Sequence, residues 1–223
     1  NAELEKRRHK TLLTALQGQI NPHFLYNIFT SIILLLKDQK IDSAIQMLVA
    51  TGKLFKSSLY GAQELVVLRE EIQHVSNYIE IQKIRHYNLL EYSIDIDEMF
   101  YNIQVPKFIL QPLVENAIEH GMYENRVLHI EINCSQSHRK DEQITITIRD
   151  DGKGIPEVRL KEIMAKLSEP VNTEHHGLSN VNERIRLQFG EEYGIHIEST
   201  EDCGTNVEIN LPYIKKGGNR NNV

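Results

Sequence analysis

The chain lacks three features that would direct its function elsewhere. It has only two cysteines in 223 residues, Cys134 and Cys203, and their spacing matches no zinc-binding pattern. Positive charge is not in excess: the net charge of -6 argues against a nucleic-acid-binding surface, which is normally basic. The longest purely apolar run, Ile32 to Leu36, is far too short to cross a bilayer. We therefore expect neither a zinc domain, nor direct nucleic-acid binding, nor a membrane span within these residues.

The termini and the cysteines indicate the cellular setting. Two cysteines permit one disulfide or two free thiols, and so few in a chain of this length favour a reducing compartment. No signal peptide is present, and the sequence begins at Asn1 without a methionine. We therefore expect a fragment from which a preceding membrane segment has been removed.

The first part of the chain is predicted to be helical. Apolar residues recur at three- and four-residue steps through residues 3–36, and a polar turn, KDQK, follows at 37–40. A second helix is predicted at 41–60, and the short connection favours an antiparallel hairpin. A third helix is predicted from Leu68 to Tyr87.

The pattern then changes to alternating apolar and polar residues, which is typical of strands with one buried face. Five segments show it: EYSIDID, VLHIEIN, QITITIR, GIHIEST and NVEINL. Helical stretches lie between them, from Lys107 to His120 and from Leu178 to Phe189. The predicted fold class is α+β, with a helical hairpin followed by a two-layer α/β sandwich. Its parts are a hairpin at 1–65, a connecting helix at 66–90, the sandwich at 91–214 and a disordered tail at 215–223.

A proline interrupts the first helical stripe, directly before a histidine. Inside a helix, Pro22 removes one hydrogen bond and crowds the carbonyl of Gly18, at a cost of about 3 kcal/mol. Two interpretations are open: a kink accommodated at Gly18, or a helix start with Asn21 as N-cap and Pro22 in the first turn. Both place His23 at a local irregularity. On residue type alone, a hydrogen-bonded core histidine is the commoner outcome.

Three later segments stand in the order expected of a nucleotide site. In QPLVENAIEHG, Asn116 and His120 share one helix face, and an Asn oxygen suits Mg2+ already held by phosphates. In IRDDGKGIP, Asp150 can accept from an exocyclic amine, while Gly152 and Gly154 permit close backbone approach. In HHGLSNVNERI, a loop runs into a helix whose free N–H groups can bind phosphates. Each segment alone is more readily a capped helix, a glycine turn or a helix start; their order is the signal.

These segments also resemble a known family. PLVENAIEHG, DDGKGIP, GLSNVNERI and CGTNVEINLP are similar to the N, G1, G2 and final-strand motifs of the Bergerat-fold (GHKL) ATP-binding domain. LQGQINPHFLYN and LREEIQHVSNYIEIQKIR resemble the histidine-kinase segment of LytS/YesM-type sensor histidine kinases. The resemblance covers residues 12 to 213, nearly the whole chain. It implies a protein histidine kinase that uses ATP and Mg2+ and passes its phosphoryl group to an aspartate of a response regulator.

The resemblance assigns roles to individual residues. His23 would be the phosphoacceptor, and Asn27 would position a water that hydrolyses the regulator's phospho-aspartate. Asn116 would hold Mg2+ through the ATP phosphates, with Glu115 reaching the metal through water, and Asp150 would bind the adenine amine. The other expected nucleotide-binding residues are His120, Gly152, Gly154, Ile155, Gly177, Leu178 and Thr205.

The chain departs from the general histidine-kinase pattern at three places. Phe24 follows His23 where many kinases have an acidic residue, which leaves the general base unassigned. The sequence His175-His176-Gly177-Leu178 replaces the frequent G-x-G-L at the end of the expected lid, about residues 155–176. Glu119 stands where a basic residue is frequent.

Other classes on the same fold are alternatives. A GHKL ATPase that acts as a conformational clamp would carry a water-activating glutamate one turn before Asn116, where this chain has Pro112. A serine/threonine kinase of the anti-sigma type would not need NPHFLYN. A pseudokinase would bind nucleotide without transfer, and the altered lid sequence is compatible with it.

The hairpin is expected to bring two copies together. One of its stripes is too apolar for exposure, and such hairpins pair into four-helix bundles, so a homodimer is predicted. The stripe comprises Leu13, Leu16, Ile20, Phe24 and Ile28. The resemblance further implies that the chain is the cytoplasmic region of a bacterial plasma-membrane protein, whose sensor region would precede Asn1.

Overall fold

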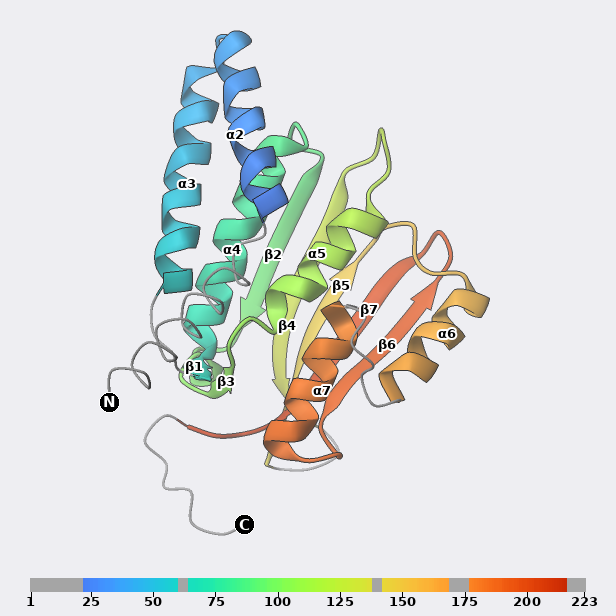
Figure 1. Cartoon of the computed structure of the whole chain (residues 1–223). Coiled ribbons are helices and arrows are strands. Elements are labelled where there is room, and N and C mark those ends of the chain that lie inside the picture. The colour runs from blue at the N-terminus through green and yellow to red at the C-terminus, as the bar shows by residue number, and fades with distance from the viewer. Residues whose placement is uncertain (1–21, 60–63, 138–141, 169–176, 216–223) are drawn as a thin grey trace, which may run out of the picture. The chain divides into compact units, whose positions relative to one another are not determined.

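The structure is a computed structural model that describes residues 22–59, 64–137, 142–168 and 177–215. The chain divides into two compact units, with the boundary after residue 60. In the described residues the first unit is a pair of helices, and the second is a sheet covered on one face by helices (Figure 1). The unit boundary lies close to the predicted end of the hairpin at residue 65.

The first unit is a hairpin of α2 (Pro22–Lys37) and α3 (Ile41–Leu59). Gln39 has a φ of 59° and ends α2, and the N–H of Lys40 donates to the carbonyl of Leu35 at 2.8 Å. The predicted turn at 37–40 and the second helix are thus confirmed. Residues 3–21, and with them the predicted kink at Gly18, lie outside the described residues.

A seam of buried residues joins the two helices. Their spacing of three and four residues brings them onto one stripe of each helix. The seam consists of Ile28, Ile32 and Leu35 on α2 and Ala44, Met47, Thr51 and Leu54 on α3.

This seam corrects one part of the dimer prediction. Ile28 was expected to face a second copy, but it is only 1% exposed and lies in the seam of its own hairpin. The physical reason is that two paired helices need an apolar stripe for each other before any remains for a partner. Phe24 is half-buried, and Leu13, Leu16 and Ile20 lie outside the described residues.

The second unit is built on a five-stranded mixed sheet of order β2-β4-β5-β7-β6. Only β2 and β4 are parallel, and the other neighbours are antiparallel. All five predicted strands are present, with ends that differ by a few residues. Their bounds are β2 (Leu90–Ile96), β4 (Leu128–Gln136), β5 (Gln143–Asp150), β6 (Gly194–Thr200) and β7 (Gly204–Pro212).

Three short elements were not predicted. Strands β1 (Leu65–Val67) and β3 (Gln104–Pro106) form a separate antiparallel pair. A 3-10 turn, η1 (Glu98–Phe100), precedes β3. Segments of three residues are too short to show a period, which is why the sequence pattern gave no indication of them.

Helices cover one face of the sheet (Figure 1). They are α4 (Leu68–Arg85), α5 (Leu110–Gly121), α6 (Glu157–Ser168) and α7 (Gly177–Phe189). Apolar residues of the strands point toward them, as with Ile144, Ile146 and Ile148 of β5, which are at most 2% exposed. The alternation seen in the sequence therefore separates a covered face from an open one.

The two helices around the first strands agree with the prediction to different degrees. Helix α5 begins at Leu110 rather than Lys107, because Phe108 has a φ of 59° and cannot continue a right-handed helix. Helix α4 begins at Leu68 as predicted and ends two residues early, and it packs on α5 and β2 within the second unit.

Asn182 joins three elements of the second unit. It lies on α7 and is 2% exposed. Its amide nitrogen donates to the carbonyl of Leu167 at the end of α6 at 2.9 Å, and its oxygen accepts from the N–H of Ile195 in β6 at 2.8 Å. One side chain thus satisfies a buried carbonyl of α6 and a half-buried N–H of β6.

We predict that Asn182→Ala lowers the free energy of unfolding by about 1–3 kcal/mol, because it removes two hydrogen bonds and leaves the half-buried N–H of Ile195 without its acceptor. Asn180→Ala, the same change at an exposed position of the same helix, is the control and should stay within about 0.5 kcal/mol of the parent. Denaturant unfolding measures both. Equal losses in the two variants would contradict the bracing role of Asn182.

Candidate functional site

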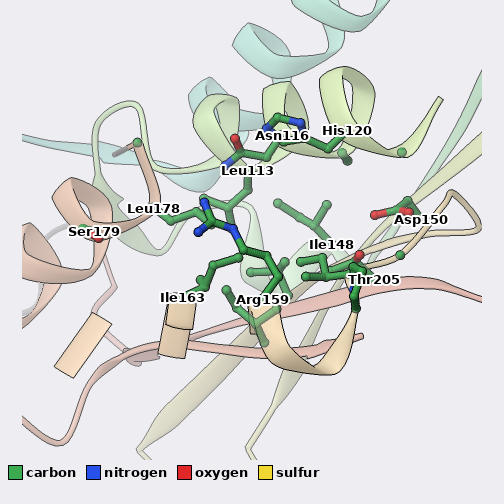
Figure 2. Close-up of a pocket in the computed structure, with 18 of the residues that line it drawn as sticks. Leu113, Asn116, His120, Ile148, Asp150, Arg159, Ile163, Leu178, Ser179 and Thr205 are labelled. Atoms are coloured by element: carbon green, nitrogen blue, oxygen red, sulfur yellow. The ribbon is translucent and has the colours of Figure 1, made fainter. Parts of the chain in front are cut away.

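A cavity of about 470 Å3 lies between α5, α6, the start of α7 and the sheet (Figure 2). Its size is that of a small-molecule site. The walls are mainly apolar, with Leu113 from α5 and Ile148 and Ile197 from the strands. Polar groups stand at its margins, so it can enclose a flat apolar ring and contact charged groups beside it.

Eight of the residues predicted to bind nucleotide line this cavity. They are Asn116, His120, Asp150, Gly154, Ile155, Gly177, Leu178 and Thr205. Figure 2 shows Asp150 and Thr205 together at one end, with Asn116 and His120 on the helix above. Leu178 and Ser179 lie toward the other end.

Asp150 supplies a buried carboxylate at the end of β5. It is 6% exposed, and one of its oxygens accepts from the N–H of Gly152 at 2.9 Å. Burial raises its pKa from the ordinary value of 3.8 to about 6, and the neighbouring Asp151 also raises it, while backbone N–H groups of Gly152 and Thr205 act in the opposite direction. Asp150 is therefore mainly an acceptor at pH 7.

Gly152 does not line the cavity, and it acts through packing instead. A Cβ at this position would lie 2.6 Å from the Cα of Gly121, the last residue of α5, and 2.8 Å from an Asp150 oxygen. The N–H of Lys153 donates to the carbonyl of Gly121 at 3.0 Å. The glycine thus allows the turn after β5 to lie directly against α5.

Ser199 connects the two sides of this end of the cavity. Its hydroxyl oxygen accepts from the N–H of Ile155 at 2.8 Å and donates to the carbonyl of Gly204 at 2.8 Å. It also lies 2.9 Å from the hydroxyl of Thr205. The sequence analysis missed Ser199, because a serine in an alternating strand carries no distinctive signal.

Of the two residues predicted to contact a metal, only one lines the cavity. Asn116 lines the cavity, but Glu115 does not: its carboxylate accepts from the side-chain amide of Gln111 at 2.7 Å. Among the described residues, no group of three or more His, Cys, Asp and Glu side chains could hold a metal ion. A divalent cation here would therefore depend on Asn116 and on the phosphates of a bound nucleotide.

Helix α6 adds two cations that the sequence analysis missed. Arg159 and Lys166 line the cavity, and Figure 2 shows Arg159 reaching across it. Arg159 also forms an ion pair with Glu162 at 2.7 Å. Residues 155–176 were predicted only as a lid. Leu160, Ile163 and Leu167 recur at helical spacing, and this pattern predicts the helix.

The first turn of α7 completes the cavity. Gly177, Leu178 and Ser179 line it, and the first four N–H groups of a helix have no partner within the helix. Such a helix start attracts anionic groups. His175 and His176, which precede it, lie outside the described residues.

The comparisons with known proteins agree with this geometry. Residues 103–215, just over half of the chain, match the family model of histidine kinase-, DNA gyrase B- and HSP90-like ATPases. The chain belongs to this ATPase family. Residues 11–90 match a second model, that of histidine kinases. Membership of this family implies that the domain at residues 103–215 binds ATP.

Several sensor kinases are similar over most of the chain. YesM of Bacillus subtilis (strain 168) is 35% identical over 213 residues, which are 95% of this chain and 35% of that protein. LytS of Staphylococcus saprophyticus is 34% identical over 204 residues, 90% of this chain and 34% of the relative. BtsS of Escherichia coli (strain K12) is 31% identical over 212 residues, 92% and 35% respectively. The chain thus spans about a third of the length of these relatives.

A solved structure supports the fold. The catalytic domain of histidine kinase ThkA aligns with a TM-score of 0.51 and 21% identity, over 68% of this chain and 97% of that domain. The predicted α/β sandwich is thereby confirmed as the fold of the ATPase family.

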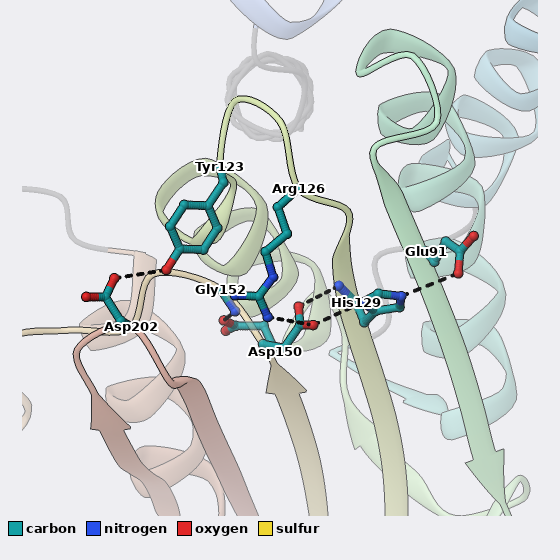
Figure 3. A network of polar contacts seen from close by, with 8 residues as sticks. Glu91, Tyr123, Arg126, His129, Asp150, Gly152 and Asp202 are labelled. Atoms are coloured by element: carbon teal, nitrogen blue, oxygen red, sulfur yellow. Dashed lines mark hydrogen bonds and ion pairs between the residues drawn. The ribbon is translucent and has the colours of Figure 1, made fainter.

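The next residue, Asp151, has different surroundings from those of Asp150, and Figure 3 shows two of its partners, Arg126 and His129, with Glu91 on the far side of the His129 ring. It accepts from the N–H of His129 at 2.8 Å, from its ring at 3.0 Å and from Arg126 at 3.2 Å. Partial burial acts to raise the pKa of Asp151, but these His129 and Arg126 contacts outweigh it and lower the pKa. Glu91 contacts the other ring nitrogen of His129 at 3.5 Å. Asp151 therefore links the end of β5 to the start of β4, while Asp150 lines the cavity.

The two predicted residues of the hairpin belong to the first unit. His23 is the second residue of α2, and Asn27 follows it by one helical turn with a half-buried side chain. The histidine-kinase model covers both residues, whereas the ATPase-family model begins at residue 103.

The raised pKa of Asp150 makes a prediction about stability. Because the folded state binds this proton more tightly than the unfolded chain does, the stabilising contribution is full below about pH 4 and is lost as pH rises through about 6. Between pH 4 and pH 7 the free energy of unfolding of the unmutated chain should fall by about 2–3 kcal/mol more than that of Asp150→Asn, whose amide does not titrate in this range. Unfolding at several pH values measures the difference, and a carboxyl titration by NMR with a midpoint below pH 4.5 would contradict it.

Proposed function

We propose that this chain is the kinase region of a two-component sensor histidine kinase. It transfers the γ-phosphoryl group of ATP to His23 and then to an aspartate of a response regulator. The observation that carries the proposal is the presence in one chain of a histidine-kinase segment containing NPHFLYN and an ATPase-family cavity. The cavity alone would not distinguish a kinase from the other ATPases of its family.

The chemistry of the cavity supports a defined orientation of ATP. Asp150, ionised at pH 7, can accept from the adenine amine, and the apolar side chains of Leu113 and Ile148 can enclose the ring. Arg159 and Lys166 and the N–H groups at the start of α7 lie at the cavity to receive the phosphates. Asn116 is the proposed protein ligand of Mg2+, which offsets phosphate charge when bound.

The transfer step needs little from the protein besides positioning. An unperturbed imidazole is mostly neutral at pH 7, so a ring nitrogen of His23 can form the bond to the γ-phosphorus while the bond to the ADP oxygen breaks. The proton on the other ring nitrogen passes to water, since no protein base is assigned. Phe24 cannot accept it, so the general base is not the next residue in the chain.

The lining of the cavity favours this proposal over a hydrolytic clamp. Within the described part of the chain, Asp150 is the only carboxylate that lines the cavity, and it stands at the proposed adenine end. Pro112 occupies the position one turn before Asn116 on α5, so no carboxylate stands there to activate water. A bound ATP is therefore better placed to await a separate phosphoacceptor than to be hydrolysed.

Labelling with γ-labelled ATP tests the function. The parent should acquire acid-labile label, which identifies phosphohistidine, and His23→Gln should acquire none. Asn116→Ala should reduce labelling at least about a hundredfold, since removing a key electrostatic contact commonly costs two or three orders of magnitude in rate. Acid-stable label in the parent, or undiminished label in His23→Gln, would overturn the proposal.

We also propose that two copies associate through the hairpin. Apolar residues outside the seam recur on α2 at three- and four-residue steps, the heptad spacing of helices that pair. These are Tyr26, Phe29, Ile33 and Leu36, all about half exposed or more, and α3 adds Ile41, Ile45, Leu48 and Val49. So large a contiguous apolar surface is uncommon on a monomer.

Ile33→Glu tests this association. It replaces a 54%-exposed isoleucine by a charge that would meet its symmetry mate, so the dissociation constant of the dimer should rise roughly a hundredfold or more. Gln46→Glu adds the same charge at an exposed position about 160° around α3 from Leu48 and is the control. Sedimentation equilibrium distinguishes them. A dimer unaffected by Ile33→Glu would place the contact elsewhere.

The remaining parts of the proposal concern the whole protein. The relatives named as sensors are about three times as long as this chain, which supports a membrane-anchored sensor region in the full-length protein. In the described residues, none of the helices has the length and apolar character to cross a bilayer. Asn27 is proposed to position the water that removes the phosphoryl group from the regulator.

A further inference from the structure

A buried carboxylate outside the cavity holds the start of α5. Glu71 lies on α4 and is 2% exposed. One of its oxygens accepts from the N–H of Phe108 at 2.7 Å, and the other accepts from Ile109 at 3.0 Å and Leu110 at 3.3 Å. Helix α5 has no side-chain cap of its own. A residue from a neighbouring helix therefore does what an N-cap residue normally does.

Phe108 is held from a second side by α7. Arg184 donates to the carbonyl of Phe108 at 3.0 Å. Phe108 has a φ of 59°, a conformation that a bulky residue adopts only when its surroundings enforce it. The ring of His74 on α4 contacts the Phe108 ring edge-on, with centroids 4.9 Å apart. One strained residue is thus fixed by charged or polar groups of two helices.

Several groups around Glu71 favour its ionised form, against the effect of burial. Burial raises the pKa of Glu71, whereas the three N–H groups and the charge of Arg184 favour its ionised form. The positive end of the α5 dipole acts in the same direction as those N–H groups. Arg184 is itself half-buried, and its Nε is enclosed with no hydrogen-bond partner in the described structure.

The helices joined here are those that form the phosphate side of the cavity. Asn116 lies on α5, about 9 Å along the axis from Leu110, and Leu178 and Ser179 lie in the first turn of α7. Asp150, by contrast, stands on β5, and none of the contacts of Glu71 or Arg184 reaches it.

We propose that Glu71 and Arg184 are positioning residues which, acting through Phe108, hold Asn116 and the start of α7 in the arrangement that binds the metal and phosphates. This inference rests on the proposed function of the cavity. It assigns Glu71 no contact with ATP. Because α4 is the first helix after the hairpin in the chain, a shift of α4 would change the phosphate end of the site and leave the adenine end in place.

Glu71→Gln tests the proposal. The change keeps the shape but replaces an acceptor oxygen by an NH2 group that faces N–H donors. Adenosine binding without metal, measured by calorimetry, should stay within about twofold of the parent. The gain in ATP affinity on adding Mg2+, and the initial rate of His23 labelling, should each fall at least about tenfold, the range seen when a supporting contact of a metal site is removed.

Val75→Ala is the matched control. Val75 lies one turn further along α4 and is 0% exposed, so its truncation destabilises the same helix without touching the N–H groups of α5. It should lower the melting temperature but leave the Mg2+-dependent gain unchanged. If Val75→Ala reduced that gain as much as Glu71→Gln, a merely structural role would be established instead.

Arg184→Gln provides a second, independent variant should Glu71→Gln fold poorly. It should show the same separation between adenosine and Mg-ATP binding. Because both residues act through Phe108, the double variant should lose little more than the worse single variant. If the losses of the two single variants multiplied in the double variant, the shared role would be overturned.

The parent chain separates failure of this inference from failure of the proposed function. A parent that binds neither adenosine nor Mg-ATP would overturn both. A parent that binds both and labels His23, while Glu71→Gln and Arg184→Gln keep the full Mg2+-dependent gain, would overturn the positioning role alone.

Discussion

The close contact between the end of α5 and the turn after β5 is the constraint on which the cavity depends. Gly152 lies so near Gly121 that no side chain fits between them, and the N–H of Lys153 donates to the carbonyl of Gly121. This contact brings Asp150, at the end of a strand, beside a helix that carries Asn116 and His120. Two polar sets from distant parts of the sequence thereby face one apolar space.

The two ends of the cavity are built differently, and this difference has a functional meaning. Asp150 and Thr205 stand on paired strands at one end, where backbone ladders fix them. The other end is formed by helices that are joined by polar contacts as well as apolar packing. Among them are the contacts of Glu71 and of His74, whose ring nitrogen lies 2.6 Å from the Gln111 oxygen. A buried polar interface is specific in register but sensitive to displacement. On the proposed function, a displacement of α4 would therefore affect the phosphate end before the adenine end.

Sequence reasoning succeeded where a period or a motif was long. The five alternating strands, α3, α4 and α7 were predicted because their patterns extend over several residues, and eight predicted nucleotide-binding residues line one cavity. It missed Arg159 and Lys166, because the segment was interpreted as a lid rather than tested for helical spacing. It placed Ile28 on a dimer face, because periodicity identifies an apolar stripe without naming what covers it.

The sequence by itself determined the alternation that separates the two faces of the sheet, the glycines that permit close approach, and the order of the motifs. Only the tertiary structure decided that Glu71 caps α5, that Arg184 holds Phe108, and that Glu115 turns from the cavity toward Gln111. The physical reason is that local patterns report a residue's own helix or strand. A contact between residues 37 or 76 positions apart, such as Glu71 with Phe108 or Arg184 with Phe108, depends on how the elements pack.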